Sequence, residues 1–426
     1  MKDKIILFFV RRHAGEIDWI LPLLSKYKKQ HKIITIFANQ SSYESLKNNS
    51  DIFKIWKSIC KNYLIITNKN KFFWKILNKI LILLKNLFNN KIQVLNNFQN
   101  YVLENTFDLN NFLKIFKIKL IDIKVLFLPI VDQSYISKIF KLKNSKILIV
   151  RFPESTMITA NKKENPNIVT SMFSNVTGDV FVFSSKSNKE YFLGDNNLYN
   201  SKIIYSGFLR YEKWWINKFL TKKKKTNIFK ILVAIRGPNE FYYQKSSYIK
   251  TIKDIMEIVK NIKNCKAIFK VHPQDKDIYL LKDILSKFNK NFWSISSNHI
   301  LKLSQNSDFC ISILTSACFD CLSIKKPTVE YYDVEREISL SKNAINHNHM
   351  IFDKRKKKWI TIFNYKNLLK TFDNKENLQE IIYQVFNGKK NNLWEKNFNE
   401  FQKLIKNKID AARLFEEINK YQKQLN

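Results

Sequence analysis

The stretch SDFCISILTSACFDCLSIKKPTVEYYD (307–333) contains two short apolar runs separated by a helical segment. The runs, DFCISI (308–313) and TVEYYD (328–333), are mostly apolar and do not alternate regularly with polar residues. This pattern is typical of strands that are buried on both faces of a parallel sheet. A strand, a helix and a second strand in this order predict a βαβ unit with a right-handed crossover.

The same pattern recurs along the whole chain, which predicts the α/β fold class. Helical segments such as 246–264 lie between many of the apolar runs. We predict further strands at IILFFV (5–10), KIITIFA (32–38), YLIIT (63–67), KVLFLPI (124–130), KILIV (146–150), VFVFSS (180–185), KIIYSG (202–207), KILVAIR (230–236), AIFKVH (267–272) and FWSIS (292–296).

The chain is long enough for two domains. It has 426 residues, of which 45% are hydrophobic, and this exceeds one typical domain. The charged run TKKKKT separates the two series of strands, and a block of like charges is typical of a linker. We predict two doubly wound Rossmann-like domains, at 1–211 and 229–390, with a linker at 212–228. The remaining residues, 391–426, carry an apolar stripe with helical spacing.

The chain is strongly basic. Lys and Arg total 74 and Asp and Glu 36, so the net charge is +38. This charge favours anionic partners such as nucleotides, phospholipid headgroups or nucleic acid. The alternative is a drift in composition with a solvated basic surface, because Lys, Asn and Ile are abundant throughout. No recognisable nucleic-acid motif or basic-aromatic stripe is present, so no specific nucleic-acid partner is expected.

The cysteines and histidines predict neither disulfides nor a metal site. Most of the five cysteines lie in apolar runs, which predicts reduced, buried thiols. The pair His347 and His349 lacks further ligands at metal-binding spacing. Residues 1–16 do not resemble a signal peptide, and no uncharged apolar run reaches about 18 residues. We therefore predict a cytoplasmic protein.

The segment KFFWKILNKILILLKNLFNNK (71–91) stands apart from the rest. Its apolar residues share one helical face, and lysines interrupt the sequence. Such a helix can lie on an anionic membrane, here the inner face of the plasma membrane. The alternative is a helix packed on the sheet, with lysine side chains that reach past it to water.

Polar groups follow successive strand ends in the second half, where ligands bind in open α/β sheets. Arg236 supplies a forked donor for phosphate oxygens, and His272 supplies a hydrogen bond. Thr315 and Ser316 add hydroxyls at a helix start, where backbone N–H groups favour anions. Asp320, one turn later, is placed to accept from ribose hydroxyls. Together they predict a nucleotide-binding site.

The sequence resembles a known enzyme group in this region. FKVHPQD (269–275) and 307–333, with its Lys326-Pro327 turn, resemble the C-terminal half of GT-B fold glycosyltransferases that build surface polysaccharides. Those relatives are CDP-glycerol glycerophosphotransferases, capsule Kdo and polysialic acid transferases, and bacterial sialyltransferases. SGFLRYEKWW (206–215) resembles the glycine–arginine–tyrosine turn of the glycerophosphotransferases, and RRHAGEIDWILPLL (11–24) resembles their first strand-to-helix turn.

The resemblance implies a GT-B arrangement, in which two Rossmann-like domains face a cleft and the C-terminal helices cross back to the first domain. His272, Thr315 and Ser316 would contact the donor phosphates, and Asp320 the ribose. The chain departs from the pattern at Asp320, where glutamate is commoner. It also lacks an evident histidine–glycine turn in the first domain, where RFPEST (151–156) occupies the comparable place.

The function expected from this resemblance is metal-independent transfer from a CMP-, CDP- or UDP-linked donor. The enzyme would be a glycosyltransferase or glycerophosphotransferase of surface polysaccharide or capsule biosynthesis, with a saccharide or lipid-linked acceptor and no cofactor. The candidate catalytic bases are Glu16, Asp18 and Glu154, although each is also suited to stabilising a helix start. Arg12 and His13 are candidates to contact an acceptor or a phosphate.

Two other functions fit the same observations. A non-hydrolysing UDP-sugar 2-epimerase has the same fold and uses similar groups at its strand ends. A third possibility is a non-enzymatic protein that binds an anionic polymer or nucleic acid through its basic surface. Product analysis separates the first two, and steeply salt-dependent DNA binding identifies the third.

Overall fold

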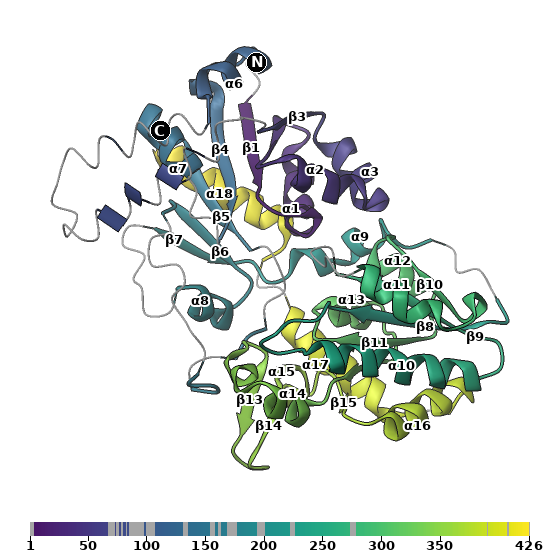
Figure 1. Cartoon of the computed structure of the whole chain (residues 1–426). Coiled ribbons are helices and arrows are strands. Elements are labelled where there is room, and N and C mark those ends of the chain that lie inside the picture. Colours follow the sequence, from purple (N-terminus) through teal and green to yellow (C-terminus); the bar gives the residue numbers. More distant parts are fainter. Residues whose placement is uncertain are drawn as a thin grey trace.

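The chain folds into two α/β domains, each built on a parallel sheet with helices on both faces (Figure 1). The structure is a computed structural model. It describes residues 4–66, 107–130, 135–153, 158–160, 163–167, 177–193, 201–221, 226–272, 278–389, 391–406 and 409–425, and positions 73, 76, 77, 80, 81, 83, 84 and 98.

The first domain contains a seven-stranded parallel sheet in the order β3-β2-β1-β4-β5-β6-β7. Every strand predicted for this half is present. The strands are β1 (Lys4–Val10), β2 (His31–Phe37), β3 (Asn62–Ile65), β4 (Ile123–Pro129), β5 (Leu148–Phe152), β6 (Val180–Phe183) and β7 (Lys202–Tyr205). Side chains alternate between the two buried faces, so Ile6 and Phe8 join one apolar cluster while Ile5 and Leu7 join another. This double burial explains the near-continuous apolar runs.

The second domain contains a six-stranded parallel sheet in the order β10-β9-β8-β11-β12-β15. The predicted strands of this half are also confirmed. The strands are β8 (Phe229–Ile235), β9 (Cys265–Val271), β10 (Trp293–Ile295), β11 (Phe309–Ile313), β12 (Thr328–Tyr331) and β15 (Thr371–Phe372). The antiparallel hairpin of β13 (Met350–Asp353) and β14 (Lys358–Thr361) was not predicted, because its turn is a run of charged residues.

Helices cover both sheets and close the two cores. In the first domain they are α1 (Ala14–Tyr27), α2 (Gln40–Lys47), α3 (Ser50–Ile59), α6 (Leu109–Phe116), α7 (Tyr135–Lys143) and α8 (Lys186–Leu193). In the second they are α10 (Lys245–Asn261), α11 (Ile278–Ser286), α12 (Ile300–Gln305), α13 (Ala317–Ser323), α14 (Val334–Leu340), α15 (Ile362–Tyr365) and α16 (Lys375–Phe386).

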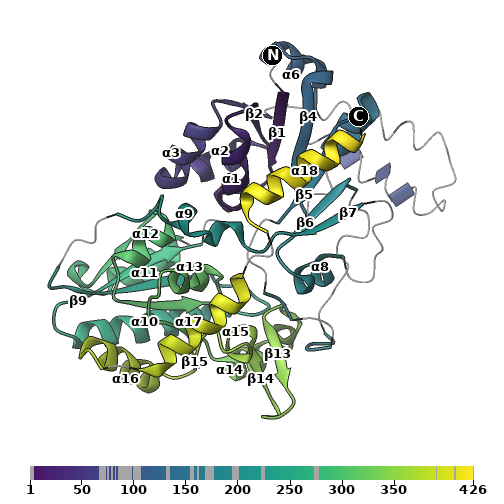
Figure 2. The ribbon, with the colours of Figure 1, turned by 180° about the vertical axis from the view of Figure 1, so that it is seen from behind.

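The C-terminal helices join the two domains, as expected from the resemblance. Helix α17 (Asn392–Ile405) packs on α13, where Phe401 stacks on Phe319 with ring centroids 5.7 Å apart. Helix α18 (Ala411–Leu425) crosses to the first domain (Figure 2), where the ring of Phe415 meets Tyr27 at 4.4 Å. The apolar stripe of the tail is therefore divided between the two domains.

Packed structure leads into the segment predicted as a linker (212–228) and forms its first part. A 3-10 turn, η2 (Leu209–Tyr211), leads into α9 (Lys213–Ile216) between the domains. Trp215 and Phe219 are buried in the apolar cluster that also holds residues of both domains. Burial of these aromatic side chains anchors the connection before the charged run begins.

Two further predictions concern the cysteines and the segment 71–91. All five cysteines are buried and free of disulfides, as predicted. Most of 71–91 lies outside the described residues, so its predicted membrane contact stays a prediction. Within the described residues, no helix combines the length and the apolar character needed to span a bilayer.

Candidate functional site between the domains

A cavity of about 130 Å³ lies where the carboxyl ends of the two sheets face each other. The first domain contributes the turn after β1 and the start of α1. The second contributes the ends of β8 and β9 and the turn from β11 into α13. Its polar lining residues are His13, Asp18, Asn49, Arg210, Lys270, His272, His299, Thr315, Ser316 and Asp320.

The cavity brings together most of the residues predicted from the sequence. Both domains contribute, because the carboxyl ends of parallel strands meet at one edge of each sheet. The predicted residues in the lining are His13, Asp18, His272, Thr315, Ser316 and Asp320. The other predicted residues, Arg12, Glu16 and Arg236, are not part of it, and Glu154 lies outside the described residues.

His13 and His272 face each other across the cavity, with ring centroids 6.2 Å apart and an edge-to-face orientation. Burial, with the nearby charges of Arg12 and Arg11, lowers the pKa of His13 to about 4. Burial and the charge of Arg236 lower the pKa of His272 to about 3. Both rings are therefore neutral near pH 7, and an arriving anion favours their protonation.

The turn into α13 presents two hydroxyl groups to the cavity. The Oγ1 atom of Thr315 accepts a hydrogen bond from Ala317 N at 3.3 Å. Ser316 is the N-cap residue, yet its side chain makes no capping hydrogen bond to the described residues. Leu314 has a φ of 50°, in the left-handed region, which turns the chain sharply at the strand end. Because the side chain of Ser316 makes no capping hydrogen bond to the described residues, its hydroxyl is available to a ligand.

The remaining predicted residues have other roles or positions. The carboxylate of Glu16 accepts hydrogen bonds from Arg11 N at 2.6 Å and Arg12 N at 3.0 Å, which organises the turn before α1. The Arg12 side chain is exposed at this turn. The guanidinium of Arg236 lies 5.6 Å from the ring centre of Tyr242, and its charge reaches His272.

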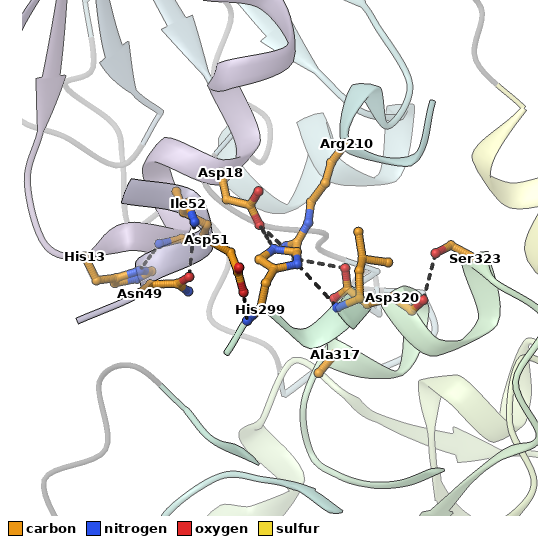
Figure 3. A network of polar contacts seen from close by, with 12 residues as sticks. His13, Asp18, Asn49, Asp51, Ile52, Arg210, His299, Ala317, Asp320 and Ser323 are labelled. Atoms are coloured by element: carbon orange, nitrogen blue, oxygen red, sulfur yellow. Dashed lines mark hydrogen bonds and ion pairs between the residues drawn. The ribbon is translucent and has the colours of Figure 1, made fainter. Parts of the chain in front are cut away.

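A buried ionic network lies beside the histidine pair (Figure 3). Arg210 Nη2 is 2.9 Å from Asp18 Oδ2 and 2.7 Å from Asp320 Oδ1. His299 Nε2 lies 3.0 Å from the same Asp18 Oδ2. Asp18 and Arg210 belong to the first domain, Arg210 in the η2 turn at its end, and Asp320 and His299 belong to the second domain. The network therefore spans the interdomain boundary.

The charges of this network are unequal, with two carboxylates around one guanidinium. Burial raises the pKa of Asp18, but Arg210 and His299 outweigh burial and leave it below its ordinary value. Burial raises the pKa of Asp320 to about 6, because the opposing effect of Arg210 only partly compensates. Burial disfavours the charged Arg210, yet Asp18 and Asp320 outweigh it and raise the pKa of that guanidinium.

Asp51 extends the network on the side of α3. Its carboxylate accepts hydrogen bonds from His299 N at 3.0 Å and from Lys302 Nζ at 3.1 Å. Burial raises the pKa of Asp51, but these two donors lower it overall. Stacking of His299 on Phe219, with centroids 3.9 Å apart, holds the imidazole plane in place.

Lys270 supplies a cation at the end of β9 that sequence reasoning missed. Its Nζ donates to Ser297 O at 3.1 Å, and among the described residues no carboxylate lies within ion-pair distance. Burial lowers the pKa of Lys270 to about 8. The sequence did contain a signal for Lys270. It lies near the end of β9, two residues before His272, so the two side chains point to the same face.

The groups that line the cavity suit a ligand with a phosphate next to a hydroxyl-bearing part such as a sugar. Lys270 and the two neutral histidines can donate to phosphate oxygens, and Thr315 and Ser316 add hydroxyls. The ionised carboxylate of Asp18 can accept a hydrogen bond from a hydroxyl group of the ligand. Among the described residues, no group of three or more His, Cys, Asp or Glu side chains is placed to hold a metal ion.

Comparisons with known proteins show what this fold is similar to. No family model and no curated protein matches the sequence. The S. aureus MnaA–UDP structure is 12% identical with a TM-score of 0.55, and the match covers 99% of this chain and 98% of MnaA. The UDP-GlcNAc 2-epimerase from Neisseria meningitidis, bound to UDP-GlcNAc, is 12% identical with a TM-score of 0.55, covering 99% and 100%.

A polymerase has the same architecture. The wall teichoic acid polymerase TagF, soaked with CDPG, is 13% identical with a TM-score of 0.53, and the match covers 99% of this chain and 89% of TagF. At such identities the likeness shows the fold alone. It confirms the predicted GT-B arrangement of two Rossmann-like domains.

Proposed function

We propose that this protein binds a nucleotide-activated donor in the interdomain cavity and transfers the activated group to an acceptor hydroxyl. The donor is CMP-, CDP- or UDP-linked, and the acceptor is a saccharide or a lipid-linked saccharide. The enzyme is then a glycosyltransferase or glycerophosphotransferase of surface polysaccharide biosynthesis. Its cytoplasmic location and a membrane contact through 71–91 belong to the same proposal.

The observation that carries this proposal is the meeting of His13 and His272 in one cavity beside Lys270. The three groups come from strand ends of two sheets, and all three can donate to oxygens of a phosphate. Thr315 and Ser316 lie in the same lining, at the start of α13. Solved structures with this fold are described with UDP and with CDPG, which supports a nucleoside diphosphate as the ligand class.

A UDP-sugar 2-epimerase is the second candidate. The structures with TM-scores of 0.55 include MnaA with UDP and an epimerase bound to UDP-GlcNAc. The products distinguish the two functions, because an epimerase returns an isomeric nucleotide sugar and a transferase releases nucleotide when acceptor is present.

Isothermal titration with CMP, CDP and UDP tests the proposal. We expect at least one nucleotide to bind, and His272→Ala to weaken that binding about 10-fold or more, because a charge-assisted hydrogen bond is lost. His31→Ala is the matched control, since His31 starts β2 and does not line the cavity. Absence of binding by the unmodified protein, or equal affinities for wild type and His272→Ala, would contradict the proposed site.

A further inference from the structure

One of the two groups that hold the carboxylate of Asp18 comes from the other domain. Asp18 lies in α1 and Arg210 in the η2 turn at the end of the first domain, whereas His299 lies at the start of α12 in the second domain. Both partners contact the same oxygen, Oδ2, at 2.9 Å and 3.0 Å. The orientation of this carboxylate therefore depends on how the two domains sit together.

The hydrogen bonds of His299 determine which of its two ring nitrogens carries the hydrogen. Its Nδ1 accepts from Leu301 N at 3.3 Å, so the ring hydrogen lies on Nε2 and is donated to Asp18. The backbone N of His299 is itself bound to Asp51 of α3. His299 thus has two hydrogen bonds to the first domain, one from its ring and one from its backbone.

The second oxygen of Asp18 is in a different position. Oδ1 is buried, and no hydrogen-bond partner reaches it among the residues that the structure describes. The residue lines the cavity next to the start of α1. Glu16, two residues earlier, has both carboxylate oxygens occupied by the amides of Arg11 and Arg12. Of these two neighbouring carboxylates, only Asp18 has an oxygen left for a ligand hydroxyl within the described structure.

We infer that Asp18 is the catalytic base of the proposed transfer and that Arg210 and His299 are positioning residues, of which His299 reaches Asp18 only when the two domains are closed. This inference rests on the proposed function. Closure brings α12 and α13 against α1 and α3, and it places the base and the donor site in one cavity. A transferase built this way avoids deprotonating water before its donor is enclosed.

The chemical step follows from these positions. The acceptor hydroxyl gives its proton to Asp18 Oδ1, and its oxygen forms a bond to the centre being transferred. The bond between that centre and the nucleotide phosphate oxygen breaks, and the electron pair leaves with the nucleotide. The departing phosphate carries the new negative charge, which Lys270 and His272 are placed to stabilise.

The charged neighbours of Asp18 come from every element packed around it. Arg210 and His299 contact it directly, Asp320 shares Arg210, and Lys270 lies in the same lining. When Asp18 accepts a proton, the Arg210 guanidinium is left to Asp320 alone.

The test compares Asp18→Asn with Asp108→Asn, a first-domain control in which Asn caps α6 as well as Asp does. Nucleotide affinity is measured by isothermal titration, and turnover by nucleotide release from the CDP- or UDP-linked donor whose nucleotide binds. We expect Asp18→Asn to keep its affinity within about threefold and to lose about 10²- to 10⁴-fold in kcat. Full turnover by a folded Asp18→Asn variant would overturn the assignment of the base.

His299→Phe keeps a ring that can stack on Phe219 but has no hydrogen to donate to Asp18, so it tests the positioning role separately and applies even where Asp18→Asn fails to fold. Loss of the His299 hydrogen raises the pKa of Asp18, so the acid limb of the kcat–pH profile should move to higher pH. A merely structural defect lowers kcat without moving this limb, and that result would overturn the positioning role. Wild-type protein that binds no nucleotide would instead refute the proposed function, which distinguishes the two failures.

Discussion

His299 Nε2 lies 3.0 Å from Asp18 Oδ2, although 281 residues separate them in the chain. Both side chains are 2% exposed, so the contact is shielded from solvent. Breaking one member of a buried hydrogen-bonded charge pair leaves the other without compensation. The pair therefore links the relative placement of the two domains to the environment of the cavity.

Lys270→Met should weaken binding of CDP or UDP about 10- to 100-fold, because it removes a charged donor to the phosphates. The effect should be smaller for CMP, which carries one phosphate fewer. Lys266→Met is the matched control, since Lys266 lies on the same strand and does not line the cavity. Isothermal titration measures both variants, and equal losses in the two would contradict a specific role for Lys270.

Nucleotide binding should be accompanied by proton uptake near pH 5. Free His272 is neutral there because burial and the charge of Arg236 lower its pKa to about 3. A phosphate beside the ring favours the charged form and raises that pKa, so the complex binds a proton that the free protein does not.

The uptake is obtained from titrations in two buffers of different ionisation enthalpy. His272→Gln corrects for protons that the nucleotide itself exchanges. The proton uptake of the wild type should exceed that of His272→Gln by up to about one proton. No difference between the two proteins would show that His272 does not meet the phosphates.

Asp320→Asn should change how stability depends on pH. The pKa of Asp320 is raised from 3.8 to about 6, so the folded chain keeps a proton that the unfolded chain has released. Its stabilising contribution is complete below pH 3.8 and is lost as the pH rises through 6. The free energy of unfolding of the wild type, relative to Asp320→Asn, should fall by about 2 kcal/mol between pH 4 and 7.

Urea unfolding of the two proteins across this pH range measures the difference. The quantity to compare is the pH dependence and not the absolute stability, because Asp320→Asn also removes a partner of Arg210. Parallel curves for the two proteins would contradict a raised pKa at Asp320.

Local patterns in the sequence predicted the fold and one wall of the cavity. Buried strands have continuous apolar runs, and their carboxyl ends converge, so His272, Thr315 and Ser316 could be grouped before the structure was known. The two-residue β15 and the hairpin of β13 and β14 have apolar runs of three residues or fewer, too short for this signature, and were missed.

The interdomain contacts could not be predicted in this way. Arg210 and His299 lie far from Asp18 in the chain. Folding of the first domain brings Arg210 to Asp18, and the relative placement of the two domains brings His299 to it. Arg210 lies within SGFLRYEKWW, but nothing in that segment indicates a buried ion pair. Burial of Glu16 against the amides of its own turn likewise depends on local backbone geometry that residue types do not specify.

Labelling of Lys270 tests most directly where the nucleotide binds. Its pKa of about 8 leaves more free amine near neutral pH than an ordinary lysine has, and Lys266 on the same strand provides an internal reference. Reductive methylation is followed by mass spectrometry with and without saturating CDP or UDP. A nucleotide in the interdomain cavity should slow modification of Lys270 and leave Lys266 unchanged. Unchanged labelling of Lys270 in the presence of bound nucleotide would contradict the proposed site.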